Sequence, residues 1–540
     1  MRKPGRWWRG RKRGRSPRRR VAFRPVKPQG EREALRSRVA SRRRLHVDVG
    51  SALDLVGSIT KYLALTPLIP AGVALGYGES PWPFLTTAAL VLVAGLALER
   101  VPGRKERVGP REGYLVVALT WVVVAGVGAL PYLLSGDPQV NRPLDAYFEA
   151  MSGFTTTGAT ILTDIDDLPR GLLIWRQLTQ WFGGMGIIVL AIAILPRLRV
   201  GGRQLIESEL PGPEHEPITT RIRDTARQLW ILYIGLTALM AVILICFGWF
   251  GIDDRMHPFN AIGHALTTLP TGGFSPENLG AVVFAAPSQW VMTLFMLLAG
   301  TNFALFYRAL MRREPSAFHR DEEFRLYLGL LLIATVVICV SIWTAGIASG
   351  EAAIRHAAFQ TVSMMTTTGY GSFDFALWPG VALMALVGLM FIGGCAGSTS
   401  GSVKVARHLL MGKILRREVD LTLHPEIVSV IRSNRTRVNE KTLRAISAFV
   451  LLYIGVFILG VAVLAIDASA TGLDLSVIEA VAAAATTLGN VGPGFGFAGP
   501  LGGFEPFGDV STATMIVLMW MGRLELIPVL VLFTRHYWRA

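Results

Sequence analysis

The stretch Leu144–Gly158, LDAYFEAMSGFTTTG, is the part of the sequence that decides the fold. It has the pattern of a short helix that ends in a polar, threonine-rich turn closed by glycine. Three other stretches share this pattern: Phe259–Gly273 (FNAIGHALTTLPTGG), Arg355–Gly369 (RHAAFQTVSMMTTTG) and Ile478–Gly492 (IEAVAAAATTLGNVG). Each begins 14 positions before its final glycine and has alanine third. This common register indicates an internal repeat, which sets the architecture.

The spacing of the repeats predicts a membrane protein. The closing glycines lie 115, 96 and 123 residues apart (273−158, 369−273, 492−369), which leaves room for two membrane helices of about 20 residues between successive turns. Apolar runs cover residues 55–78 and 82–99, then 113–134 and 171–195, 228–250 and 287–307, 325–347 and 380–410, and 443–466 and 510–533. We therefore expect an all-α polytopic membrane protein with ten transmembrane helices. An N-terminal helix pair precedes four pseudo-symmetric repeats of helix, re-entrant turn and helix around a central pore.

The composition agrees with a membrane protein. Of the 540 residues, 51% are hydrophobic and only 17% are charged, whereas a soluble domain usually carries about 25% charge. The three cysteines, Cys246, Cys339 and Cys395, fall in or beside apolar runs without metal-ligand spacing, so neither disulfides nor zinc are expected. No HExxH, GxSxG, Walker A or dinucleotide-binding motif appears in a suitable context, so we expect no enzyme.

Basic loops set the expected orientation and domain boundaries. They follow the second helix of each pair, and both chain ends are basic as well. The positive-inside rule places these segments and both termini in the cytoplasm, so the four turns open to the opposite side. The expected segments are a basic disordered tail (1–50), the helix pair (51–110), repeat 1 with a cytoplasmic loop (111–227), repeat 2 (228–322), repeat 3 with a gate loop at 393–404 and a cytoplasmic connector (323–442), and repeat 4 (443–540).

The Arg-rich residues 1–45 have three interpretations. They form a solvated cytoplasmic tail that leans on anionic lipid, a nucleic-acid-binding segment, or a docking arm for a partner. We favour anionic lipid and expect no nucleic acid. The charged cytoplasmic segments 200–227 and 411–442 are either docking surfaces for a soluble regulatory subunit or solvated connectors, and a short hairpin is expected near 427–431.

The four turns are too short to cross a membrane. Non-helical backbone at membrane depth is tolerated only where it is buried in protein or lines a watery cavity, so we expect the turns to converge on one axis. Their backbone carbonyls and threonine hydroxyls would then replace the hydration shell of a cation. The alternative is that each Thr-Gly stretch only marks an extracellular turn. The predicted ion-binding residues are Thr156, Thr157, Gly158, Thr271, Gly272, Gly273, Thr367, Thr368, Gly369, Asn490, Val491 and Gly492.

Two further features are expected below the turns. The segment Gly393–Lys404, GGCAGSTSGSVK, is too rich in glycine and hydroxyl residues for a good straight helix. We interpret it as a flexible gate; close helix packing through small residues is the alternative. Arg523 interrupts the last span and should face the cavity or a carboxylate, where it either limits cation flux or forms a structural ion pair. The predicted gate residues are Gly393, Gly394, Gly397, Ser398, Gly401, Lys404 and Arg523.

Several motifs together make the chain resemble the TrkH/Ktr superfamily of bacterial potassium-translocating subunits, and the TrkH form more than the shorter Ktr form. They are FEAMSGFTTTGAT, QWFGGMGIIVLAIAILP, ELPGP, TLPTGGFS, FIGGCAGSTSGSVK, NVGPG and MGRLE. The resemblance implies four M1–P–M2 units around one potassium pore, assembly as a homodimer, and a cytoplasmic nucleotide-binding partner of the TrkA type. It also assigns the family's filter to the twelve turn residues, its gate loop to Gly393–Lys404 and its pore arginine to Arg523.

The leading hypothesis is therefore potassium uptake across the bacterial inner membrane, with K+ as the transported ion. Potassium selectivity comes from the resemblance alone, because the turns lack the TVGYG string of potassium channels. A sodium-coupled or weakly selective monovalent cation transporter is the alternative, and symport with protons stays open. A sensor that binds an ion without conducting it is a third class.

Overall fold

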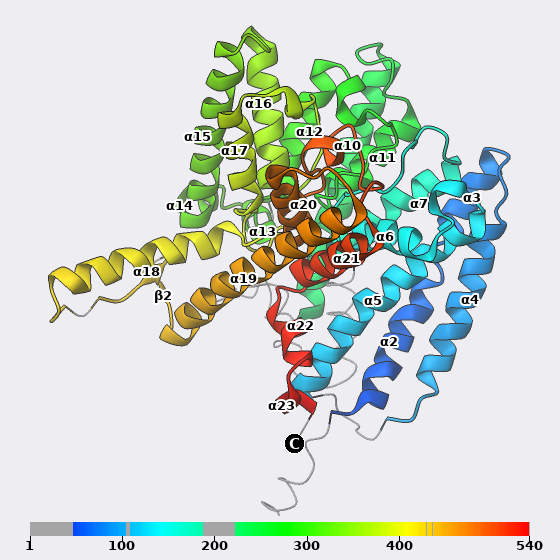
Figure 1. The fold of residues 1–540 in the computed structure, drawn as a ribbon, viewed down its shortest axis with the longest axis horizontal. Helices are drawn as coiled ribbons and strands as arrows, with labels where there is room; N and C mark the ends of the chain where they lie inside the picture. Colours follow the sequence, from blue (N-terminus) through cyan, green and yellow to red (C-terminus); the bar gives the residue numbers. More distant parts are fainter. Residues whose placement is uncertain are drawn as a thin grey trace, which may run out of the picture. The chain divides into compact units, whose positions relative to one another are not determined.

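The computed structural model describes residues 47–103, 109–186, 222–310, 312–427, 429–434 and 436–538. The predicted basic tail up to residue 46 and most of the first cytoplasmic loop lie outside these residues. Within them, the one pair of strands is an antiparallel hairpin of β1 (Arg432–Ser433) and β2 (Thr436–Arg437), a few residues after the place where the sequence predicts it. Almost all other regular structure in the described ranges is helical (Figure 1), so the expected all-α class is confirmed.

Three helices form the N-terminal part of the described chain. They are α2 (Val49–Leu63), α3 (Leu68–Gly76) and α4 (Trp82–Glu99). Gly57 and Gly95 let α2 and α4 approach closely. A Cβ on Gly57 would come within 3.0 Å of the Gly95 carbonyl oxygen, and a Cβ on Gly95 would lie equally close to the Gly57 carbonyl oxygen. An ion pair of 2.5 Å between Lys61 and Glu99 joins the same two helices. The predicted N-terminal pair therefore packs as one hairpin, with its first member broken between α2 and α3.

Four groups of helices follow, and each contains a long helix, a short helix that ends at one of the turns, and a further broken helix. The first group is α5 (Pro110–Ser135), α6 (Pro143–Phe154) and α7 (Arg170–Trp181), and the second is α10 (Ile222–Trp249), α11 (Pro258–Thr268), α12 (Ala286–Ala299) and α13 (Phe303–Leu310). The third is α15 (Glu322–Thr344), α16 (Gly350–Met365), α17 (Gly380–Met390) and α18 (Val405–Leu423), and the fourth is α19 (Glu440–Thr471), α20 (Val477–Gly489), α21 (Asp509–Arg523) and α22 (Ile527–Leu532). Short elements complete the set: α14 (Ser316–Arg320), α23 (Arg535–Trp538), η1 (Pro138–Val140), η2 (Phe182–Gly186), η4 (Gly280–Val283), η5 (Phe375–Leu377) and η6 (Gly496–Ala498).

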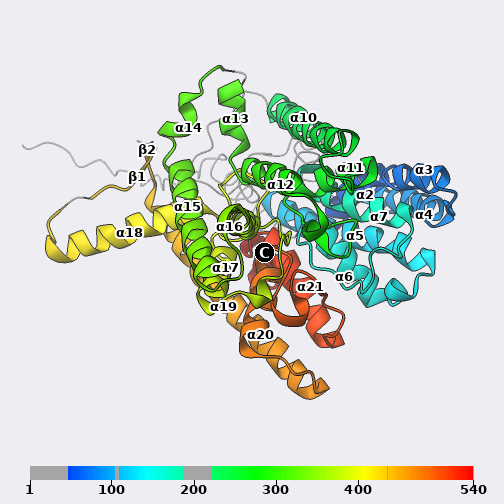
Figure 2. The same ribbon diagram turned by 90° about the horizontal axis from the view of Figure 1, so that it is seen from above.

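The four groups pack in a closed cycle. The broken helix of each group contacts the short helix of the next, in the pairs α7 with α11, α12 with α16, α17 with α20, and α21 with α6. Figure 2 shows the groups disposed about a common centre. The long helices α5, α10, α15 and α19 each contact the short helix of their own group. This packing brings the ends of all four short helices toward one place.

Several helices can cross a membrane by length and composition. Among the described residues they are 49–76, 82–99, 111–135, 227–249, 322–344 and 440–471, and the pair α12 and α13, bent by 95°, adds a seventh if it is one span. The predicted spans at 171–195, 380–410 and 510–533 begin with helices of only 12, 11 and 15 residues and then break. Ten spans in four repeats therefore stay a prediction, as do the domain boundaries.

The starts of the short helices agree with the sequence in three groups. Asp145, Asn260 and Glu479 are each the third residue of their helix. The expected start of the third stretch at Arg355 is wrong, because α16 begins five residues earlier at Gly350 and His356 lies in its interior. An ion pair of 3.0 Å between Glu351 and Arg355, four residues apart, stabilises the additional turn.

Candidate functional site

The four turns share one backbone conformation. The residues two positions before the closing glycines have φ between 52° and 57°: Thr156, Thr271, Thr367 and Asn490. The closing glycines have φ of 83°, 81°, 84° and 118°: Gly158, Gly273, Gly369 and Gly492. A non-glycine residue held at such a φ costs about 1–3 kcal/mol and persists only where the surroundings fix it. The same conformation in four separate turns indicates that the carbonyl directions it sets are needed.

Each closing glycine lies against the next turn in the cycle. A Cβ on Gly158 would come within 3.0 Å of the carbonyl oxygen of Gly272, a residue of the second turn. The same holds for the other three pairs, which are Gly273 with Thr368, Gly369 with Val491, and Gly492 with Thr157. In all four pairs the oxygen belongs to the residue before the next closing glycine, so the turns follow one another in a closed ring. The structure thus brings the twelve predicted turn residues together, and any side chain at the glycines would displace a carbonyl.

Side-chain hydrogen bonds hold neighbouring turns in this ring. The Asn490 side-chain nitrogen donates to the Thr157 hydroxyl oxygen at 2.9 Å, which ties the fourth turn to the first. The Gln180 side-chain nitrogen, on α7, donates to the Gly272 carbonyl oxygen at 2.7 Å. The Gln180 side-chain oxygen accepts the Phe274 amide at 3.1 Å. The first group therefore fixes the backbone of the second turn from both sides.

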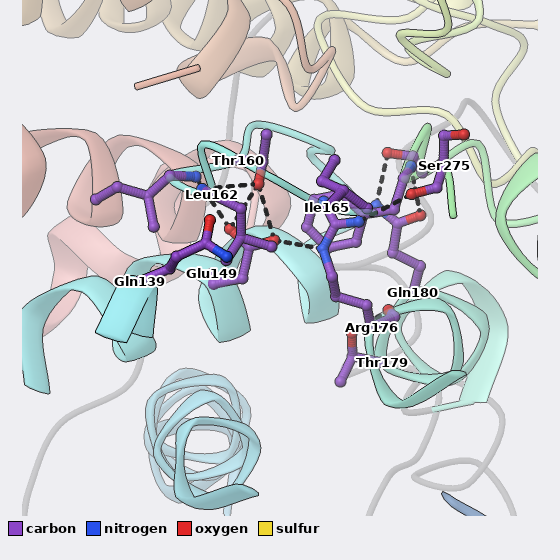
Figure 3. Close-up of polar contacts among 12 residues, drawn as sticks. Gln139, Glu149, Thr160, Leu162, Ile165, Arg176, Thr179, Gln180 and Ser275 are labelled. Carbon is purple, nitrogen blue, oxygen red and sulfur yellow. Dashed lines mark hydrogen bonds and ion pairs between the residues drawn. The ribbon is translucent and has the colours of Figure 1, made fainter. Parts of the chain in front are cut away.

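A buried ion pair behind the ring was not predicted from the sequence. The Arg176 Nε on α7 donates to a Glu149 carboxylate oxygen on α6 at 2.6 Å, and the two side chains are 1% and 0% exposed. Glu149 also accepts the Thr160 hydroxyl at 3.1 Å, and Arg176 donates to the Ser275 carbonyl oxygen at 3.0 Å (Figure 3). The guanidinium lies 3.8 Å from the centre of the Phe274 ring. We call this pair the clamp; it joins the segments that leave the first and second turns.

The predicted gate segment is non-helical and lies against the ring. The chain is irregular from Phe391 to Lys404, between α17 and α18; we call these residues the intramembrane loop, after the depth that the sequence predicts for them. The Gly401 amide donates to the Thr367 hydroxyl oxygen at 2.7 Å. The Thr399 hydroxyl donates to the carbonyl oxygen of Leu269, at the end of α11, at 3.0 Å. The loop is therefore hydrogen-bonded to the second and third turns at the carboxyl ends of their helices.

The predicted gate residues shape this loop. Those with positive φ are Gly393, Gly397 and Lys404. A Cβ on Gly394 would come within 3.0 Å of the carbonyl oxygen of Gly300, at the break between α12 and α13. Ser398 donates to a carbonyl oxygen within the loop at 2.6 Å, and the Lys404 ammonium lies 3.9 Å from a Glu525 carboxylate oxygen. The loop is thus a folded element with its own contacts.

Arg523 joins the intramembrane loop to the first group of helices. Its guanidinium donates to the Thr399 carbonyl oxygen and to the Gly183 carbonyl oxygen, both at 3.0 Å. Glu525 forms an ion pair of 2.6 Å with Arg407 on α18. A fixed positive charge therefore lies beside the loop, near the partially negative carboxyl ends of the short helices.

Breaks in the other second helices were not predicted from the sequence. The helix α7 continues as a π-helical turn, and α12 stops at Ala299. A Cβ on Gly183 would come within 3.0 Å of the Phe154 carbonyl oxygen, and one on Gly522 within 3.0 Å of the Leu488 carbonyl oxygen. Phe154 and Leu488 both stand four positions before a closing glycine. A glycine inside an apolar run was the available signal for these close approaches.

The fold defines a multi-pass membrane protein in which four turns of a single chain meet in one ring. The chain belongs to the TrkH family, described as cation transport proteins, whose model matches residues 84–539. It is 40% identical over 490 residues to the Trk system potassium uptake protein TrkH of Escherichia coli (strain K12), covering 90% of this chain and 98% of that protein. It is 38% identical over 502 residues to TrkH of Vibrio parahaemolyticus, covering 91% and 99%.

A solved structure agrees with this assignment. The crystal structure of the potassium transporter TrkH from Vibrio parahaemolyticus matches with a TM-score of 0.79 and 34% sequence identity, covering 91% of this chain and 100% of that chain. The resemblance stated from the motifs is therefore confirmed. Because proteins of this family are transporters, the expectation that the chain is not an enzyme is confirmed too.

Proposed function

We propose that this chain takes up potassium through a gated pore lined by the four turns. The observation that carries the proposal is the closed cycle in which each closing glycine lies against a carbonyl of the next turn. Such a cycle surrounds one axis with backbone oxygens, and rings of carbonyls are what replaces the hydration shell of a potassium ion. The names of the relatives, potassium uptake proteins, support potassium as the ion.

In this proposal the twelve turn residues act as the selectivity filter. The turns are buried apart from Gly158, Gly273 and Gly369, which are half-buried. The short helices point their partially negative carboxyl ends toward the ring, which favours a cation there. The threonine hydroxyls at Thr157 and Thr368 hydrogen-bond to threonines two positions earlier at 2.7 and 2.8 Å, which fixes their orientation.

The intramembrane loop and Arg523 act as the gate in this proposal. Hydrogen bonds from Gly401 and Thr399 hold the loop against the turns. In this position the loop blocks the path of an ion that leaves the filter on this side. The Arg523 guanidinium repels cations at the same place, and its bond to the Thr399 carbonyl keeps it there. Opening would require both the loop and this charge to move.

The proposal extends to assembly and location. We place the chain in the bacterial inner membrane with both termini in the cytoplasm, as a homodimer regulated by a TrkA-type nucleotide-binding subunit, with anionic lipid at the basic tail. The basic loops support the orientation. The charged connector between α18 and α19 supports the regulatory contact, and these two helices run side by side (Figure 1). Arg417 and Glu440 pair at 2.5 Å across this connector.

Two experiments test the proposed function. Expression of the chain should restore growth of a potassium-uptake-deficient bacterium at low potassium, and failure of an inserted, folded protein to do so contradicts it. Rubidium and sodium flux in liposomes, with and without a proton gradient, separates potassium uptake from a sodium-coupled or weakly selective transporter. Equal rubidium and sodium flux would favour that alternative.

A further inference from the structure

Glu323 is a half-buried carboxylate that the proposed pore does not use. It lies in the first turn of α15, in the sequence Asp321-Glu322-Glu323. One of its carboxylate oxygens accepts two backbone amides of the third group: that of Ala396 at 2.5 Å and that of Ala406 at 3.1 Å. Ala396 is the sixth of the fourteen residues of the intramembrane loop, and Ala406 is the second residue of α18, just after the loop ends. A single side chain therefore binds the chain on both sides of the loop segment 397–404.

The chemistry of this contact makes it a strong tether. Both amides belong to buried residues, and removal of the shared acceptor oxygen would leave two buried donors without a partner, which costs more than the hydrogen bonds themselves contribute. Beside Ala396, the Cys395 amide donates to the Gly300 carbonyl oxygen at 2.9 Å. The Val405 amide adds a bond of 3.0 Å to the Gly394 carbonyl oxygen, which draws the two ends together. The segment from Gly394 to Ala406 is thus closed on itself. We call its two ends, Gly394–Ala396 and Val405–Ala406, the neck of the loop, and Glu323 fixes this neck to α15.

The neighbouring acids of the same turn bind elsewhere. Glu322 pairs with Lys413 on α18, and the Asp321 carboxylate accepts the Asn434 side-chain nitrogen from the hairpin at 2.8 Å. The hydrogen bonds to the loop amides therefore come from the third acid, Glu323. This difference supplies a matched control one residue away, with the same side chain and on the same helical turn.

We propose that Glu323 is a positioning residue: its carboxylate holds the neck of the intramembrane loop, and thereby keeps the loop seated against the second and third turns. The inference depends on the proposed gate role of the loop. Loss of the carboxylate frees the Ala396 and Ala406 amides, so the loop leaves its closed position more often. The expected consequence is a pore that opens without its regulator.

Cys395 is a built-in reporter of the loop's position. It lies in the loop next to Ala396 and is 1% exposed. Replacing the other two cysteines of the sequence, as Cys246→Ala and Cys339→Ala, leaves Cys395 as the single thiol. The rate at which a water-soluble maleimide labels Cys395 in the purified, reconstituted full chain then measures how often the loop opens, independently of any ion flux.

The test compares Glu323→Ala with Glu322→Ala in this background. We expect Glu323→Ala to label about tenfold faster or more, the effect of leaving two buried amides without their acceptor, and Glu322→Ala to label at the parent rate. An unchanged rate in Glu323→Ala overturns the proposal, as does an equal acceleration in Glu322→Ala, which would mean general loosening. If Glu323→Ala does not fold, Glu323→Gln decides, because its neutral amide oxygen is a weaker acceptor: faster labelling supports the proposal and the parent rate overturns it.

Rubidium flux through the same samples separates this inference from the proposed function. We expect Glu323→Ala to pass rubidium faster than the parent and the Glu322→Ala control. Faster labelling without rubidium flux in any sample would leave the positioning role standing and contradict the potassium pore. Faster labelling with flux unchanged from a conducting parent would overturn the claim that this loop is the gate held by Glu323.

Discussion

Replacing Arg176 with methionine tests how the clamp supports the ring. The substitution removes a 2.6 Å ion pair, a hydrogen bond of 3.0 Å to the Ser275 carbonyl oxygen, and the contact with the Phe274 ring. It leaves the Glu149 carboxylate, 0% exposed, without its cation. Breaking a buried pair from one side costs about 3–5 kcal/mol. We therefore expect Arg176→Met to lower the melting temperature in detergent by several degrees, measured by tryptophan fluorescence.

A second substitution separates the stranded charge from lost packing. Glu149→Gln together with Arg176→Met leaves no uncompensated charge, and a neutral replacement of a buried pair is often tolerated. The double variant should therefore melt above Arg176→Met. The control is Arg170→Met on the same helix, whose guanidinium lies 4.9 Å from the centre of the Phe259 ring and whose loss costs about 1 kcal/mol or less.

Two results would refute the reasoning about the clamp. One is a melting temperature for Arg176→Met equal to that of the parent or of Arg170→Met. The other is a double variant that melts lower than Arg176→Met, which would mean that the carboxylate is stable without its partner. Since the clamp joins the segments leaving the first and second turns, Arg176→Met should also lower rubidium-over-sodium selectivity in liposomes.

Three further variants test the ring and the fixed charge. Gly369→Ser places a Cβ against a carbonyl of the fourth turn at φ 84°, so it should lower potassium-over-sodium selectivity in flux assays. The control Gly388→Ser, with nothing within 4 Å of its Cβ, should not lower it. Equal selectivity in both variants would remove the third turn from the pore. Asn490→Leu removes the hydrogen bond to Thr157, should cost about 1–3 kcal/mol, and should lower both melting temperature and selectivity; a parent-like protein would contradict the cross-turn tie. Arg523→Gln removes the fixed positive charge and should raise rubidium flux, while lower flux would limit this residue to a structural role.

The repeat could be predicted from the sequence because its physical requirement is local. A turn that aims carbonyls inward needs glycine at its closing position, and glycine stands there in register in all four stretches. The positive φ two positions earlier could not be predicted, because three of those residues are β-branched threonines and only Asn490 is a type that enters this region easily. The break at 393–404 was predictable from local composition, since four glycines and four hydroxyl residues in twelve positions disfavour a helix.

Long-range polar contacts could not be predicted in this way. Glu149 and Arg176 are 27 positions apart, and nothing in the sequence around either residue identifies the other as its partner. Glu323 and Ala396 are 73 positions apart, and the donor is a backbone amide, which every residue except proline carries. The breaks near Gly183 and Gly522 depend on the approach of another segment. Glycines in an apolar run permit such an approach but do not identify the segment that makes it.

The ring has one consequence for how such a protein can change over time. Because one polypeptide supplies all four quadrants, a point mutation alters a single wall, whereas in a homotetramer the same mutation is multiplied by four. The fourth quadrant already differs, with Asn490 and Val491 where the first and third have threonines. If the turns form the proposed filter, ion preference can be adjusted in small steps, one quadrant at a time, while the other three quadrants stay unchanged.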